Sequence, residues 1–427
     1  MFRDLKIGKI LIFPAVFVAV IALMLCFSLA AVYVPRENIR SNMESSAGLL
    51  TERQVFFDII EGIPASKIDR YADSILLSIA WQYDKSDPLK SLMWSSYYNY
   101  PLANENDNFR ASLENDLPAN TQYLRYWHGS ASIVRFLHLF LDLKGIYVLH
   151  GILLALLTLA LCLLLYKKGF LPLCIGTALS MAAVAAWFVP MSLEYTWTFL
   201  IMLIISIIAL FLETGKHSGL TLILFFISGM VTNYLDFLTT ETLTLCFPLI
   251  IVLFIRIEKA GACNKEHRRF ACISALLWGT GYVLTWVTKW LLAAVILKEN
   301  TLPYVTEHIE ERVSGDIGLS PLGYISGALF RNLSCLFPLG FGAAGIIAGI
   351  IIILFIIYNC YVYRKKNVDR MAVILFLIIG ILPYVRYMAL HNHSFLHYFF
   401  TYRAQAATIL SLSAILYHSV NRRFISR

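Results

Sequence analysis

The sequence predicts an all-α polytopic membrane protein with about ten transmembrane helices. Hydrophobic residues make up 59% of the 427 residues, the mean hydropathy is +0.69, and only 15% of the residues are charged. A soluble chain of this length could not bury so much apolar surface. Because apolar segments continue almost to the end of the chain, we expect a single membrane domain over residues 1–427.

Each apolar segment is close to the roughly 20 residues that a bilayer core requires. The ten segments are residues 10–33, 146–166, 170–189, 193–212, 219–236, 242–257, 270–296, 336–361, 371–389 and 399–418. If all ten cross the membrane, the basic clusters fall on one side: Arg3/Lys6/Lys9, Lys167/Lys168, Lys216, Lys259/Lys265/Arg268/Arg269, Arg364/Lys365/Lys366/Arg370 and Arg422/Arg423/Arg427. The positive-inside rule then places both termini in the cytoplasm. This pattern, with no eukaryotic targeting signal, suits a bacterial plasma membrane.

Two longer polar stretches are expected on the opposite side of the membrane. The first extracytoplasmic loop covers residues 34–145, after the first span, and the second covers residues 297–335. Within the first loop, residues 69–77 have the spacing of an amphipathic helix that lies at the membrane interface. Residues 97–116 are rich in Asn, Asp and Tyr, which predicts an irregular loop.

Charge and cysteine content exclude two other classes of protein. The net charge is +8, but the basic residues lie in short loops and tails and form no groove for nucleic acid. The eight cysteines form no Cys-x-x-Cys pair, and the first long loop contains none. We therefore expect neither a disulfide framework nor a zinc ribbon.

The strongest functional signal is a group of cationic side chains between the last two apolar segments. It consists of Arg386, His391, His393, His397 and Arg403. His393 and His397 share one face if the segment is helical, and His-x-x-x-His is a zinc-ligand spacing, but no third ligand follows. The alternatives are histidines exposed at the interface, or recognition of an anion such as phosphate by arginine forks and imidazoles.

A second polar group lies where the fifth segment meets the sixth. Asp236 and Glu241 are two carboxylates beside apolar helix ends, where acidic residues are costly. Either is a candidate catalytic residue on the same side of the membrane as the histidines. The alternative is a polar turn in which one of them caps the next helix.

The first extracytoplasmic loop contains further candidates. Asp69 and Asp73 are four residues apart, and either could take a proton from a sugar hydroxyl as a general base; Asp73 is the preferred candidate. The alternative is a solvated surface carboxylate. Arg125, Trp127 and His128 combine cations with an aromatic ring, which favours substrate binding. Their alternative role is to anchor the chain at the membrane edge.

These features together resemble the GT-C class of multi-spanning glycosyltransferases that use polyprenyl-phosphate sugars, which includes protein mannosyltransferases and aminoarabinose transferases. The resemblance is architectural and covers the whole chain. It implies catalysis at the outer membrane surface by an acidic residue of the first long loop. The matching loop offers Glu37, Glu44, Asp69 and Asp73, and it lacks the tight acidic pair that some members carry just after the first helix.

The sequence therefore favours an enzyme that transfers a sugar from a polyprenyl-phosphate donor to a glycan, lipid or protein acceptor of the cell envelope. Its partners would be this donor, membrane lipid and the acceptor, without nucleic acid. The sequence requires no cofactor and leaves a divalent cation open. Two alternatives remain: a transporter or flippase for a lipid-linked saccharide, and a non-catalytic membrane component of a polysaccharide pathway.

Overall fold

The computed structural model describes residues 12–313, 318–336 and 343–421, and 77% of the structure is helical. The predicted all-α class is confirmed, with one short two-stranded ribbon in addition. The elements before the second long helix are α2 (Ile12–Val32), α3 (Arg36–Thr51), β1 (Phe56–Asp58), η1 (Pro64–Ser66), β2 (Lys67–Asp69), α4 (Arg70–Gln82), α5 (Pro88–Trp94), α6 (Glu105–Glu114) and α7 (Gly129–Leu137).

The remaining elements are longer and mostly apolar. They are α8 (Leu143–Lys167), α9 (Leu171–Ala183), η2 (Ala186–Met191), α10 (Leu193–Thr214), η3 (Ser218–Leu220), α11 (Thr221–Leu235), α12 (Leu243–Ala260), α13 (Lys265–Leu297), α14 (Leu302–Val313), α15 (Pro321–Cys335), α16 (Ala343–Val362), α17 (Arg370–Ala389), α18 (His391–Leu396), α19 (Tyr398–Thr401), η4 (Tyr402–Gln405) and α20 (Ala406–Ser419).

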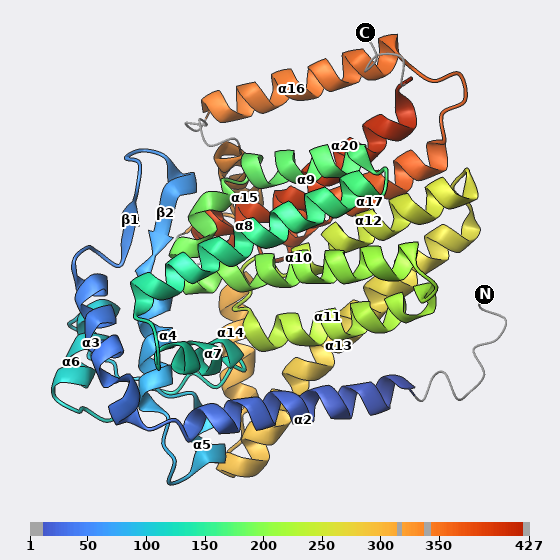
Figure 1. The fold of residues 1–427 in the computed structure, drawn as a ribbon. Coiled ribbons are helices and arrows are strands. Elements are labelled where there is room, and N and C mark those ends of the chain that lie inside the picture. The colour runs from blue at the N-terminus through green and yellow to red at the C-terminus, as the bar shows by residue number, and fades with distance from the viewer. Residues whose placement is uncertain (1–11, 314–317, 337–342, 422–427) are drawn as a thin grey trace.

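The long helices form one bundle. Figure 1 shows α2, α8 to α13, α17 and α20 running along a common direction, while α16 lies at the edge of the bundle. Six stretches of the described residues are long and apolar enough to cross a membrane: α2, α8, α10, η3 with α11, α13 and α17. All six coincide with predicted spans, so the structure supports insertion into a membrane.

The bundle has buried helices in its centre and exposed helices around them. In the most apolar stretch of α10, 72% of the residues are buried, compared with 22% in α8. Within the described part of the chain, the apolar outer face of α8 is therefore left uncovered, as expected where lipid is the solvent. Helices α11 and α13 can approach closely because Gly229 has no side chain. A Cβ at this position would lie only 2.0 Å from the Trp278 carbonyl oxygen.

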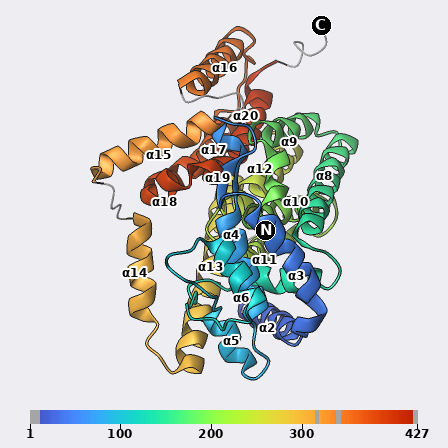
Figure 2. The same ribbon diagram turned by 90° about the vertical axis from the view of Figure 1, so that its left-hand side faces the viewer.

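Residues 33–142, which we call the cap, cover one end of the bundle. The cap contains α3 to α7, of which α3 to α6 face the viewer in Figure 2. It also contains the antiparallel β1–β2 ribbon (Figure 1), in which Phe56 pairs with Asp69. Arg135 joins α7 to α4 and to the segment just after α2, because its guanidinium donates to the Ala80 and Val34 carbonyls. The first residues of α2 and the last of α20 lie at the other end of the bundle (Figure 1).

Two segments of the cap differ from the sequence prediction. Residues 97–116 were expected to be irregular, yet α6 forms because Asn104 caps it by accepting from Asp107 N, and Phe109 and Leu113 are buried. Helix α4 begins where the predicted amphipathic helix begins, but it is buried between α6, α7 and the bundle rather than lying at an interface. The predicted basic flanks at residues 3–9 and 422–427 lie outside the described residues.

Candidate functional site

A cavity of about 360 Å³ lies where the cap meets the bundle. Four residues predicted to bind substrate line it: Arg125, His128, His393 and His397. Two carboxylates, Asp69 and Glu194, line it as well. Its other walls are apolar or aromatic: Phe56, Tyr71, Ala72, Ile75, Leu76, Tyr123, Phe237 and Phe400. The fold thus places acids, cations and rings from five separate parts of the chain around one space.

Asp69 ends β2 and caps α4, and its side chain accepts from Ala72 N at 2.9 Å. Glu194, from the first turn of α10, lines the cavity together with Asp69. Burial, with a smaller contribution from the charge of Asp73, raises the pKa of Asp69 to about 7.

His128 is buried and neutral. Its Nε2 lies 2.8 Å from the Tyr123 carbonyl oxygen, and because that oxygen can only accept, Nε2 carries the proton. Its Nδ1 therefore has a free lone pair, and no hydrogen-bond partner for it occurs in the described part of the chain. Burial, assisted by the nearby charge of Lys289, lowers the pKa of His128 to about 3.

Arg125 is held in place by aromatic side chains. Its guanidinium donates to the Tyr123 hydroxyl at 2.9 Å and lies 4.4 Å from the centre of the Tyr123 ring. Its backbone carbonyl accepts from the indoles of Trp286 and Trp290 on α13, at 2.6 and 3.2 Å. These contacts fix the segment between α6 and α7 against the bundle.

His393, in the short helix α18, and His397, between α18 and α19, form a pair. Their ring centres are 4.8 Å apart, as the four-residue spacing predicts, and the His397 ring stacks on Phe400 at 5.2 Å. His393 is almost completely buried. The pair faces the same cavity as Arg125, although the two segments are far apart in the sequence.

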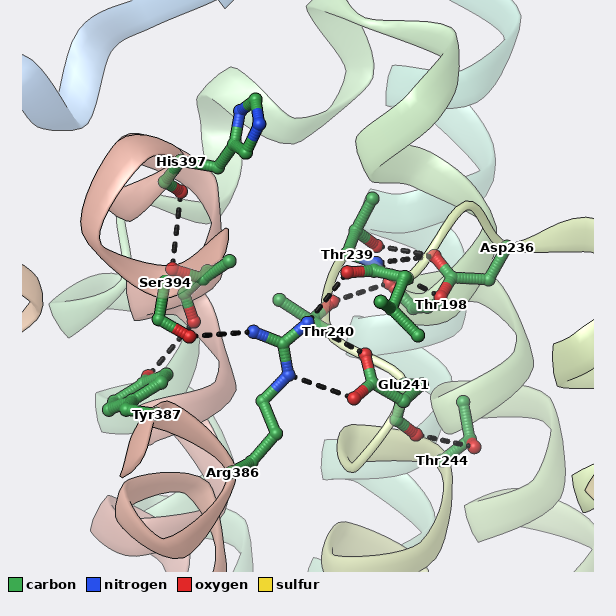
Figure 3. A network of polar contacts seen from close by, with 12 residues as sticks. Thr198, Asp236, Thr239, Thr240, Glu241, Thr244, Arg386, Tyr387, Ser394 and His397 are labelled. Carbon is green, nitrogen blue, oxygen red and sulfur yellow. Dashed lines mark hydrogen bonds and ion pairs between the residues drawn. The ribbon is translucent and has the colours of Figure 1, made fainter. Parts of the chain in front are cut away.

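The predicted residues Arg386, Asp236 and Glu241 form a separate buried network (Figure 3). Arg386 donates from Nε to Glu241 Oε1 at 2.8 Å and from Nη2 to the Leu238 carbonyl at 2.6 Å. Asp236 accepts from Thr239 N at 3.0 Å and closes the turn after α11. None of these three lines the cavity, and in Figure 3 the His397 ring points away from Arg386.

The other predicted residues also have structural contacts outside the cavity. Asp73 accepts from the Tyr147 hydroxyl, from Ser192 Oγ and from Leu193 N. The Trp127 indole donates to the Thr285 carbonyl, and His391 Nδ1 lies 3.3 Å from the Met388 carbonyl. Arg403 donates to the Ala65 and Phe399 carbonyls and lies over the Tyr195 ring. These contacts connect the cap with α8, α10, α13 and α19.

Sequence reasoning did not select Glu194, and it preferred Asp73 to Asp69. The available signal for Glu194 was its position at the start of a long apolar segment. A carboxylate there is energetically costly, so it indicates a functional role. No comparable signal separates Asp69 from Asp73, since both lie at the start of the same amphipathic pattern. Their different partners arise from the packing of α4 against α8 and α10.

The described residues contain no group of three His, Cys, Asp or Glu side chains that could hold a metal ion. The fold and the site therefore define an all-α protein with membrane character and a cavity between cap and bundle that is lined by carboxylates, cations and aromatic rings. No family model matches the chain, and no curated protein or solved structure is significantly similar to it.

Proposed function

We propose that the protein is a membrane glycosyltransferase that moves one sugar from a polyprenyl-phosphate donor to a cell-envelope acceptor. One observation carries the proposal: Asp69, Arg125 and the His393–His397 pair line a single cavity. Sugar transfer needs a base for the acceptor hydroxyl and cations for the departing phosphate, and this cavity offers both.

In this proposal Asp69 is the general base, in place of Asp73. Asp69 lines the cavity, whereas Asp73 is buried behind it with three hydrogen-bond donors. The Asp69 carboxylate takes the proton of the acceptor hydroxyl as the acceptor oxygen forms a bond to the anomeric carbon of the sugar. Glu194 lines the same cavity and positions the acceptor hydroxyl next to Asp69.

The cationic side of the cavity receives the leaving group. As the bond between the anomeric carbon and the phosphate oxygen breaks, its electron pair goes to polyprenyl phosphate. Arg125 provides a forked donor for phosphate oxygens, and His393 and His397 add imidazole donors beside it. Stabilisation of negative charge by fixed donors is a major source of catalysis in enclosed sites.

The aromatic walls and the size of the cavity limit the sugar. Tyr71 and Phe56 stack with ring centres 5.9 Å apart and present apolar faces to the cavity, as do Phe237 and Phe400. A volume of about 360 Å³ lies at the small end of the range of ligand sites. It suits one sugar with its phosphate better than a preassembled oligosaccharide.

The proposed membrane frame has ten spans with both termini in the cytoplasm of a bacterial cell. In this frame, the cap belongs to the extracytoplasmic loop at residues 34–145, and α14 and α15 belong to the second one at residues 297–335. Catalysis then takes place on the outer face, at the depth of the donor phosphate. The resemblance to the GT-C class supports this arrangement.

The test is transfer by the full-length protein in proteoliposomes that contain labelled polyprenyl-phosphate monosaccharides. We expect Asp69→Asn to reduce transfer by about 100-fold or more while the protein stays folded. Glu61→Gln is a matched control because Glu61 is an exposed carboxylate of the cap. Wild-type turnover in both Asp69→Asn and Glu194→Gln would refute the assigned base.

A second outcome would redirect the proposal. If the protein binds the donor and moves it across the bilayer without transferring its sugar to any acceptor, the transporter alternative replaces the enzyme. Asp73→Asn serves as a further comparison, since its expected effect is a lower melting temperature and not the loss of a base.

A further inference from the structure

A second pocket, of about 370 Å³, lies at the end of the bundle away from the cap. It is lined by Arg364, Val368, Arg370, Val373, Ile374 and Ser419. Arg364 follows α16, Arg370 opens α17 and Ser419 closes α20. The pocket therefore lies between the ends of three helices and shares no residue with the candidate functional site.

The charge of this pocket is entirely positive. Its lining contains two arginines and no acidic residue. The neighbouring Asp369 is engaged elsewhere, because its carboxylate accepts from Ala372 N at 3.0 Å and from Cys263 N at 2.6 Å. In the described ranges of the chain, neither Arg364 nor Arg370 forms a side-chain ion pair. Two exposed guanidiniums thus line one pocket, and neither has an ion-pair partner among the described residues.

The backbone around Arg364 is fixed. Arg364 forms an antiparallel bridge with Val420, Lys365 N donates to the Ser419 carbonyl at 2.9 Å, and Asn421 N donates to the Tyr363 carbonyl at 2.8 Å. The Lys365 ammonium also donates to the Tyr417 carbonyl. These bonds hold the segment after α16 against the end of α20, so one wall of the pocket is preformed.

An apolar surface leads away from the arginines along α17. Val373 and Ile374 line the pocket, and the exposed Ile374, Ile378 and Ile381 continue at spacings of four and three residues on one face of the helix. Helix α17 is one of the stretches able to cross a membrane. A cationic pocket at the end of an exposed apolar stripe is complementary to a phospholipid: the pocket matches the phosphate headgroup, and the apolar stripe matches an acyl chain.

From this geometry we infer that Arg364 and Arg370 bind the phosphate of an anionic phospholipid whose acyl chain lies along Ile374, Ile378 and Ile381. Arginine forks match phosphate oxygens in pairs, and basic pockets between membrane helices are typical headgroup sites. The inference concerns a site outside the proposed catalytic cavity and is independent of the proposed function.

The experiment is native mass spectrometry of the full-length protein in detergent, with phosphatidylglycerol or phosphatidylcholine added at equal concentration. We expect the protein to retain phosphatidylglycerol in preference to phosphatidylcholine. Arg364→Gln and Arg370→Gln should each weaken that retention by about tenfold, because each removes a charge-assisted contact with the phosphate. Melting temperatures of the variants show whether they are folded.

Lys366→Gln is the matched control, since Lys366 is an exposed cation of the same segment that does not line the pocket. If all three variants lost phosphatidylglycerol retention equally, the lipid would be held by the general positive charge of the segment, and the proposed site would be overturned. Glycerol 3-phosphate should displace no bound lipid at the concentration at which phosphatidylglycerol saturates. If glycerol 3-phosphate competed as well as phosphatidylglycerol, the pocket would be a site for free anions and the assignment to lipid would be overturned. Equal retention of phosphatidylglycerol and phosphatidylcholine by the wild type would also overturn the assignment to an anionic lipid.

Discussion

Arg386 and Glu241 form a buried ion pair that joins α17 to the turn between α11 and α12, with Arg386 Nε 2.8 Å from Glu241 Oε1. Ser394 Oγ and the Leu238 carbonyl accept from the remaining guanidinium nitrogens. Two residues that looked in sequence like a phosphate ligand and a catalytic acid thus bind each other. Their pairing holds α17 and α18 beside the α11–α12 turn, where Phe237 lines the cavity.

Removing one member of this pair should destabilise the protein. Arg386→Gln leaves the Glu241 carboxylate buried without its partner, for which a loss of about 3–5 kcal/mol is typical. The double variant Arg386→Gln/Glu241→Gln should recover part of the lost stability, because no charge is then left buried without a partner. Thermal unfolding of the purified protein in one detergent measures all three melting temperatures. A stable Arg386→Gln protein that has lost transfer would instead indicate that Arg386 binds substrate.

Transfer should depend on pH through Asp69. Burial raises its pKa to about 7 from the ordinary aspartate value of 3.8, and a general base acts in its deprotonated form. The value of kcat/KM should therefore rise about tenfold per pH unit below pH 7 and level off above it. The measurement is a pH–rate profile of the wild type and of Glu61→Gln, which should share one inflection. An inflection near the ordinary aspartate value would contradict the assigned base.

Arg125 should act mainly in donor binding. Loss of a charge-assisted hydrogen bond costs about 1.5–3 kcal/mol, so Arg125→Gln should raise KM for the donor by about tenfold or more. Arg125→Lys should not restore it, because an ammonium lacks the planar fork that pairs with phosphate oxygens. Steady-state kinetics test this. Arg110→Gln is the control, since Arg110 forms an exposed pair with Glu114 on the cap and should leave KM unchanged.

Gly129 should not tolerate a side chain. A Cβ there would lie 2.3 Å from the Tyr234 ring, and that ring is fixed because its hydroxyl bonds Ser28 Oγ and the Met24 carbonyl. Gly129→Ala should therefore lower the melting temperature and shift the adjacent His128. Gly48→Ala in α3 meets nothing within 4 Å and should be neutral or stabilise by about 0.5–1 kcal/mol. Equal melting temperatures for the two variants would contradict this packing.

Much of the helical framework follows from local pattern. Long apolar segments predict long helices because backbone polar groups in lipid must be satisfied within the segment. The six stretches able to cross a membrane each overlap one predicted span. Local pattern was less informative in the cap, where α6 depends on the Asn104 cap and on burial of Phe109 against α3 and α4. The packing of α6 against α3 and α4 joins residues distant in sequence, and no local spacing encodes it.

The candidate site shows the same division. By itself, the sequence determined which residue types lie near membrane boundaries, since charged and imidazole groups stand out against apolar segments; Arg125, His128, His393 and His397 were found in this way. Tertiary structure alone decided which carboxylate accompanies them. Asp69 faces the cavity with Glu194, whereas Asp73, one helical turn later, is turned towards Tyr147 and the start of α10. One turn of α4 separates the two aspartates, and their surroundings differ because packing between distant helices, not composition, determines what each carboxylate meets.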